Sequence, residues 1–224
     1  LFPDWYITRH KGQAPTPAQD KVLQAAFDAI VTENLAWPQV FVHRDFMPRN
    51  LMYAPGEALG VLDFQDAVYG PITYDIASLM RDAFLSWDEE FVLDVTIRYW
   101  ERARAAGLPV GDDFGAFYRG VEWMGLQRHL KVLGIFARLW YRDGKRGYLA
   151  DLPRVLDYVI DALPCHRDLA ALRGFMEARV LPAFAAAQAR AKFGSVATAC
   201  SNRSMARTRL RRSTNSCQAS RYSS

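Results

Sequence analysis

Three polar residues of this chain stand at a spacing that suits phosphoryl transfer. Asp45 and Asn50 are five residues apart on a predicted loop, and Asp63 ends a second apolar stretch thirteen residues after Asn50. A carboxylate on a rigid loop can orient an acceptor hydroxyl and receive its proton. An amide oxygen and a second carboxylate can hold Mg²⁺ on the phosphates of ATP. The spacing therefore predicts Asp45 as a catalytic base and Asn50 and Asp63 as magnesium ligands.

Each of these three residues also has an ordinary structural interpretation. Asp45 alone could cap a loop, Asn50 could be a turn residue, and Asp63 could be an acid at the end of a strand. The combination is more specific than its parts, because an apolar strand precedes each acid and the interval from Asp45 to Asn50 suits one site. We therefore favour the interpretation as a phosphoryl-transfer site.

Two further side chains are predicted to support the loop. His43, two residues before Asp45, can bond the backbone near Asp63. Asp75, at the start of a predicted helix, can accept backbone N–H groups of the loop. Simple capping of that helix would also explain Asp75.

Five polar side chains are candidates for contact with a substrate or its phosphates: Arg44, Arg49, Asp66, Gln127 and Arg128. The arginines could face a phosphate or an anionic substrate, and amide and guanidinium donors on a long predicted helix could line a sugar pocket. Surface charge would equally explain the first two arginines, and a solvated loop acid would explain Asp66. For the helix that carries Gln127, Arg128 and His129, we favour a solvent-facing stripe.

The elements that must position these residues are short strands and helices. Thr16, Pro17 and Gln19 form a helix-start pattern, which apolar residues at helical spacing continue to about residue 37. Short strands are predicted at 40–43, 51–53 and 60–63, and helices at about 74–85, 88–107, 112–141, 152–163 and 167–189. These patterns predict an α+β fold, mainly helical, with a small β-hairpin region that carries the catalytic and metal-binding loops.

The composition indicates a folded, cytoplasmic protein. Half of the 224 residues are hydrophobic, and no apolar run has the length of a membrane span. The three cysteines lie far from Asp45 and Asp63 in the sequence. The net charge of +4 is uneven, because residues 193–224 hold six arginines and no acid, which leaves −2 on residues 1–192. This basic, serine-rich tail is predicted to be disordered, or read in a shifted frame, rather than a nucleic-acid-binding arm.

Taken together, residues 43–50, 62–67 and 70–79 resemble the aminoglycoside phosphotransferase/choline kinase-like family. The resemblance implies a protein-kinase-like fold in which residues 1–192 form the C-terminal lobe, with Mg²⁺ as cofactor and ATP as phosphate donor. Residues 41–52 and 60–71 are most similar to the bacterial cell-wall amino-sugar kinases of that family. The implied substrate is therefore a small-molecule sugar, phosphorylated at the anomeric hydroxyl of N-acetylmuramate or N-acetylglucosamine in peptidoglycan recycling.

The chain departs from this family before Asp45. The family has an N-terminal lobe with a glycine-containing loop and a strand lysine over the phosphates, whereas this stretch has one glycine, Gly12, and two lysines outside any strand pattern, Lys11 and Lys21. We expect that lobe to be missing from these residues and the activity of the truncated chain to be low. Two alternatives stay open: a non-catalytic lobe that binds a sugar or a partner, and a kinase for an aminoglycoside, choline or homoserine.

Overall fold

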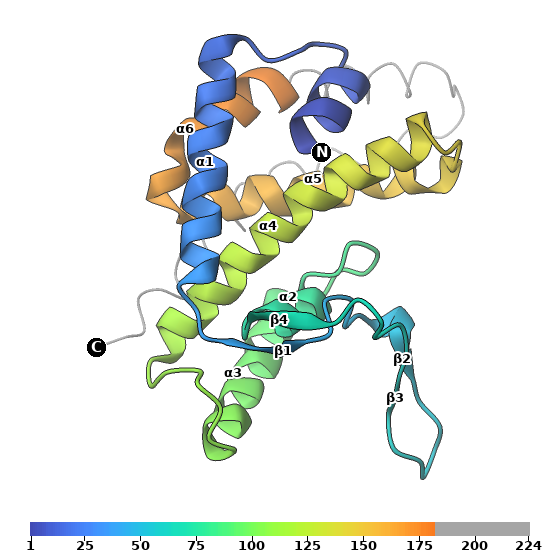
Figure 1. Ribbon diagram of the computed structural model, residues 1–224, viewed down its shortest axis with the longest axis vertical. Coiled ribbons are helices and arrows are strands. Elements are labelled where there is room, and N and C mark those ends of the chain that lie inside the picture. Colours follow the sequence, from blue (N-terminus) through green and yellow to red (C-terminus); the bar gives the residue numbers. More distant parts are fainter. Residues whose placement is uncertain (182–224) are drawn as a thin grey trace, which may run out of the picture. The chain divides into compact units, whose positions relative to one another are not determined.

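A computed structural model describes residues 1–181, which divide into two compact units (Figure 1). Unit 1 contains residues 1–27 and 131–181, and unit 2 contains residues 28–130. The described residues are mainly helical with small antiparallel sheets, which confirms the predicted α+β class. The predicted tail at 193–224 lies outside the described residues.

Helix α1 (Pro17–Leu35) begins where the sequence predicts. The backbone N–H of Thr16 donates to Oε1 of Gln19 (2.9 Å), and the N–H of Gln19 donates to Oγ1 of Thr16 (3.4 Å). This reciprocal pair occupies two N–H groups that the first turn would otherwise leave unpaired. The helix ends shortly before Pro38, as predicted.

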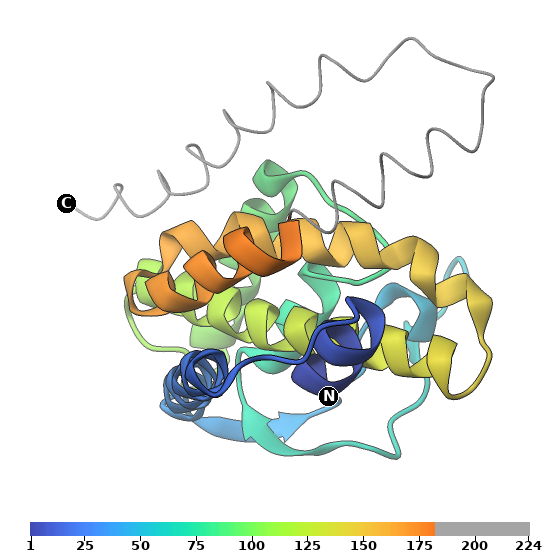
Figure 2. The same ribbon diagram turned by 90° about the horizontal axis from the view of Figure 1, so that it is seen from above.

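Two small antiparallel sheets in unit 2 carry the loops of interest. β1 (Gln39–Val42) pairs with β4 (Val68–Pro71), and the two strands run side by side in both views (Figure 1, Figure 2). β2 (Leu51–Met52) pairs with β3 (Gly60–Val61). The three predicted strands are present, the last two shorter than expected, but β4 was missed. Its Gly70 is needed because a Cβ there would lie 2.9 Å from Cγ2 of Val42 on the paired strand.

Unit 2 also contains the last part of α1, α2 (Tyr74–Met80), α3 (Glu89–Ala105) and the first part of α4 (Phe114–Tyr141). The prediction of a helix over 74–85 was too long. Oδ1 of Asp82 accepts the N–H groups of Phe84 (2.6 Å) and Leu85 (2.9 Å), so the chain turns there instead of continuing the helix. A buried apolar cluster joins these helices, with members Ile76, Met80, Val92, Trp100, Phe117 and Val121.

One close approach fixes α4 within unit 2. At Gly120 a Cβ atom would overlap the indole ring of Trp37, so only a glycine allows the helix this near to the tryptophan. Asp113 begins the helix, one residue after the predicted start at 112, since its Oδ1 accepts the N–H of Gly115 (2.7 Å).

Unit 1 is built from helical segments. Its elements are η1 (Phe2–His10), the first part of α1, the last part of α4, η3 (Arg146–Asp151), α5 (Leu152–Ala162), η4 (Leu163–Cys165), η5 (Arg167–Leu169), α6 (Ala170–Phe175) and η6 (Met176–Val180). The predicted helix at 152–163 is confirmed, whereas the helix predicted from residue 167 starts as a 3₁₀ turn and changes to a π-helical segment after α6. None of the helices within residues 1–181 has the length and apolar character needed to cross a bilayer.

Candidate active site

Asp45 lies on the loop that follows β1, and the structure brings Asn50 to it. The short 3₁₀ turn η2 (Pro48–Asn50) closes this loop, with the N–H of Asn50 donating to the carbonyl of Met47 (2.9 Å). Nδ2 of Asn50 then donates to the backbone carbonyl of Asp45 (2.8 Å). Because the amide nitrogen is used in this way, the side-chain oxygen Oδ1 is the atom of Asn50 that suits a cation.

Asp63 is linked to the same turn through its neighbour. The backbone N–H of Leu62 donates to the carbonyl of Asn50 (2.9 Å), which joins the end of β3 to the Asp45 loop. Asp63 is exposed and has a left-handed backbone, with φ of 67°, and its Oδ1 accepts a hydrogen bond from Nε2 of Gln65. Its carboxylate is thus accessible beside a backbone that is fixed to Asn50.

His43 and Asp75 make the contacts that the sequence predicts for them. Oδ2 of Asp75 accepts the N–H of His43 (2.7 Å), and Oδ1 accepts the N–H of Arg44 (2.9 Å). The side-chain Nε2 of His43 donates to the carbonyl of Leu62 (3.0 Å), so this nitrogen carries the ring proton. Asp75 therefore fixes one loop of the site, and His43 ties that loop to the one that carries Asp63.

Arg44 is held by its backbone from several sides. Its φ is 74°, a left-handed conformation that is costly for a residue with a side chain. Its carbonyl accepts hydrogen bonds from Nη1 of Arg128 (2.9 Å) and Oγ of Ser78 (3.3 Å). Its own Nη1 donates to the backbone carbonyl of Asp66 (3.1 Å). Arg44 and Arg128, predicted as candidates for substrate contact, thus also bind the backbone of the site.

The stretch at 127–129 is not the solvent-facing stripe that we favoured. Gln127 and Arg128 are half-buried, and His129 is 3% exposed. The guanidinium of Arg128 also lies over the ring of Tyr74, 5.0 Å from its centre. Burial lowers the pKa of His129 to about 3, so its ring is neutral and Nε2–H donates to the carbonyl of Arg81 (2.9 Å).

Arg49 and Asp66 are the exposed members of the predicted set. The guanidinium carbon of Arg49 lies 3.4 Å from the centre of the Phe84 ring. Asp66 takes part in the site through its backbone carbonyl. Sequence reasoning missed Ser78 and Phe84: Ser78 stood within the quoted pattern without a role, and Phe84 was expected inside a helix.

A network of ionisable groups joins the end of α2 to α3 and α4. Arg81 forms two hydrogen bonds with the carboxylate of Glu89 (2.8 Å each), and the hydroxyl of Tyr118 donates to the same carboxylate. Burial raises the pKa of Glu122 to about 7, and the positive charge of Arg81 opposes this increase. The network thus contains a carboxyl group that titrates near neutrality.

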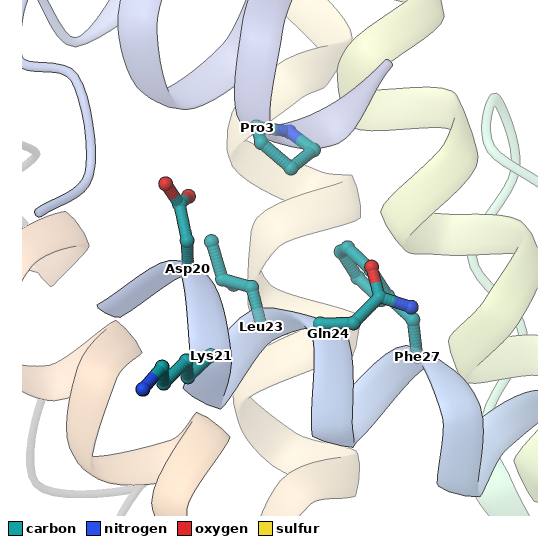
Figure 3. Close-up of a pocket in the computed structure, with 6 residues that line it drawn as sticks. All are labelled: Pro3, Asp20, Lys21, Leu23, Gln24 and Phe27. Carbon is teal, nitrogen blue, oxygen red and sulfur yellow. The ribbon is translucent and has the colours of Figure 1, made fainter. Parts of the chain in front are cut away.

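Neither a cluster of metal ligands nor the pocket of unit 1 provides a second candidate active site within residues 1–181. Within residues 1–181, no three His, Cys, Asp or Glu side chains gather as a metal site. The side-chain oxygens of Asn50 and Asp63 suit Mg²⁺ without such a cluster, since this ion takes few protein oxygens and keeps phosphate and water ligands. A pocket of about 340 Å³ in unit 1 contains none of the predicted site residues; it is lined by Pro3 and, from α1, by Asp20, Lys21, Leu23, Gln24 and Phe27 (Figure 3).

Comparison with known proteins gives a match to one family model. Residues 1–108, which include all of the loops described above, match the model of the phosphotransferase enzyme family. This stretch of the chain is therefore similar to the phosphotransferase enzyme family.

The chain is also similar to curated proteins of known name. The chain is 58% identical to the N-acetylmuramate/N-acetylglucosamine kinase of Neisseria meningitidis serogroup B over 159 residues, 71% of the chain and 47% of the relative. It is 50% identical to the kinase of the same name from Pseudomonas putida over 172 residues, 77% of the chain and 50% of the relative. It is 49% identical to the kinase of the same name from Pseudomonas aeruginosa over 175 residues, 77% of the chain and 51% of the relative. The chain spans about half the length of the curated relatives it matches.

Proposed function

We propose that this chain supplies the catalytic loops of an ATP-dependent kinase for N-acetylmuramate and N-acetylglucosamine. The observation that carries the proposal is the double link through Asn50. Its side chain bonds the carbonyl of Asp45, and its own carbonyl accepts the N–H of Leu62, next to Asp63. A base and two magnesium ligands on backbones joined in this way suit transfer of a phosphoryl group, in which positioning and charge stabilisation supply most of the catalysis.

In this mechanism Asp45 accepts the proton of the acceptor hydroxyl. The hydroxyl oxygen forms a bond to the γ-phosphorus of ATP while the bond from that phosphorus to the β–γ bridging oxygen breaks, and ADP leaves. Oδ1 of Asn50 and the carboxylate of Asp63 would hold Mg²⁺, which neutralises charge on the phosphates when bound. Asp75 and His43 keep the two loops in register, as their hydrogen bonds to the backbone indicate.

The remaining parts of the proposal follow from the family. We assign residues 1–192 to the C-terminal lobe of a protein-kinase-like fold and residues 193–224 to a separate tail. The anomeric hydroxyl is the acceptor, and the reaction serves peptidoglycan recycling in the cytoplasm, where ATP is available. The names of the relatives and their identities of 49–58% support the choice of sugar.

Two assays on the purified intact protein test this function. ADP release is measured with N-acetylmuramate and N-acetylglucosamine, and the loss of reducing ends is measured in the same samples. Phosphorylation of the anomeric hydroxyl abolishes the reducing end, so both signals should rise in equal amounts. Transfer to another hydroxyl would release ADP with the reducing ends intact and would contradict the anomeric assignment.

Matched variants link the activity to the site. Asp45→Asn should lower kcat by about 100-fold or more, the contribution of general base catalysis. Asp94→Asn, the same substitution at an exposed acid of α3 outside the site, should retain most of the activity. Full activity of Asp45→Asn, or no turnover of either sugar by the unsubstituted protein, would overturn the proposed function.

A further inference from the structure

Arg49 presents a charged group beside the residues of the proposed reaction. It immediately precedes Asn50, follows Asp45 by four residues, and is exposed. Its guanidinium carbon lies 3.4 Å from the centre of the Phe84 ring, so the cation stacks on an aromatic face. The side chain is therefore held at the edge of the site instead of extending freely into solvent.

Hydrogen bonds hold the backbone of the turn whose Phe84 ring lies under Arg49. Asp82, which is 4% exposed, accepts the N–H of Phe84 (2.6 Å) and of Leu85 (2.9 Å) through Oδ1. These bonds fix the backbone of the turn that carries the Phe84 ring. A guanidinium already stacked on a ring loses less freedom when it binds a ligand, which favours recognition by this arginine.

The other arginines around the site are engaged with the protein. Arg44 and Arg128 donate to backbone carbonyls, and Arg81 forms two hydrogen bonds with Glu89. Within residues 1–181, by contrast, no carboxylate forms an ion pair with Arg49. The ring covers one face of the guanidinium, while the N–H groups at its edge point in the plane, in the fork geometry that matches a carboxylate.

The two proposed sugars differ in one charged group. N-acetylmuramate is N-acetylglucosamine with a lactyl ether on O3, and that ether ends in a carboxylate. We infer that Arg49 binds this carboxylate and is a specificity-determining residue for N-acetylmuramate. This inference rests on the proposed function, and it goes further by assigning the discrimination between the two sugars to one side chain.

Comparison of the two sugars in variants of the intact protein tests the inference. Arg49→Gln should lower kcat/KM for N-acetylmuramate by about 10- to 100-fold, the range for loss of a hydrogen-bonded charge pair. The value for N-acetylglucosamine should stay within about threefold, since that sugar has no carboxylate. Arg49→Lys, which keeps the charge but not the fork, should give an intermediate loss for N-acetylmuramate. Arg119→Gln, at an exposed arginine of α4, is the control and should change neither value.

A second variant tests the aromatic platform. Phe84→Leu removes the ring and keeps the charge of Arg49, so it should give a smaller loss that is again confined to N-acetylmuramate. An equal fall for both sugars in Arg49→Gln would overturn the inference and assign Arg49 to the phosphates or to the loop, while the kinase itself would stand.

Binding measured by calorimetry without nucleotide decides the inference independently of turnover. If the unsubstituted protein phosphorylates neither sugar, the proposed function fails. Selective loss of N-acetylmuramate binding in Arg49→Gln would still support carboxylate recognition. Unchanged binding of N-acetylmuramate in that variant would overturn it.

Discussion

Nη1 of Arg128 donates a hydrogen bond to the carbonyl oxygen of Arg44, 2.9 Å away and 84 residues earlier in the chain. The same carbonyl also accepts a hydrogen bond from Oγ of Ser78, and the N–H of Arg44 donates one to Asp75. A non-glycine residue with φ of 74° costs about 1–3 kcal/mol. These contacts compensate for that cost and fix the peptide bond that leads directly into Asp45.

Arg128 is therefore expected to act as a positioning residue. Arg128→Gln should lower kcat by about 10- to 100-fold through loss of a charge-assisted hydrogen bond, with KM for the sugar nearly unchanged. Steady-state kinetics on the intact protein measure both parameters. A rise in KM with constant kcat would instead indicate that Arg128 binds the substrate, and Arg119→Gln on the same helix serves as the matched control.

Asp75 should be important for stability as well as for the site. Asp75→Asn replaces one of the two acceptor oxygens for the N–H groups of His43 and Arg44 by an NH₂ group, which leaves a donor facing a donor. The free energy of unfolding should fall by about 1.5–3 kcal/mol, measured by urea titration. The exposed ion pair of Asp94 and Arg98 offers a contrast, since Asp94→Asn should cost less than about 1 kcal/mol. Equal effects of the two substitutions would argue against the role of Asp75.

A substitution at Asp63 can test metal binding without changing the backbone conformation. Asparagine tolerates a left-handed backbone, so Asp63→Asn should keep the turn at φ of 67° and remove only the charge. The affinity for Mn²⁺ in the presence of ATP, measured by electron paramagnetic resonance, should fall at least about 10-fold, the smaller of the losses seen when residues that support a metal ligand are changed. The melting temperature should be nearly constant. Unaltered Mn²⁺ binding would exclude Asp63 as a ligand.

The contact between α4 and Trp37 is a packing test that does not involve the site chemistry. Gly120→Ala would place a methyl group inside the indole ring, so the free energy of unfolding should fall by about 1–3 kcal/mol. Gly174→Ala in α6 is the matched control, because nothing lies within 4 Å of its added Cβ. That substitution should raise stability by up to about 1 kcal/mol. Similar losses in both variants would show that the close approach is not the cause.

Glu122 predicts how stability depends on pH. Its pKa is raised from 4.5 to about 7 in the folded protein, so between these values the folded state keeps a proton that the unfolded state loses. Stability from this group therefore falls as the pH rises from 4.5 to about 7. Glu122→Gln removes the effect, and its advantage over the unsubstituted protein should grow across this window and then level off. Urea titrations at several pH values measure the difference, with Glu101→Gln at an exposed glutamate of α3 as control.

Local patterns in the sequence were sufficient for much of the fold. The cap at Thr16 and the helix start at Asp113 depend on residues three positions apart or fewer, and both occur within one residue of the predicted positions. The end of α2 was misplaced, because the apolar residues after Met80 continue a helical pattern while the Asp82 side chain turns the backbone. β4 was missed because its pairing with β1 depends on a residue more than 25 positions away.

The candidate site likewise contains residues and contacts that the sequence could predict and others that it could not. Asp45, Asn50 and Asp63 could be selected from type and spacing, and so could the contacts of His43 and Asp75. The contacts of Arg128 could not, since nothing near that arginine in the sequence indicates that its partner is the carbonyl of Arg44. Arg49 was named as a candidate, but its aromatic platform depends on a turn that the sequence pattern did not reveal.

The hydrogen bonds that hold His43 and Arg44 also order events during folding. Their partners lie 31 to 84 residues later in the chain, on α2 and α4. The Arg128 contact closes a much longer loop than the pairing of β1 with β4, and longer loops are entropically more costly, so we expect this contact to form after the small sheet. The geometry around Asp45 is thus acquired only when α4 docks in unit 2, and a nascent chain released before residue 128 would contain every predicted catalytic and metal-binding residue without the clamp that aligns them.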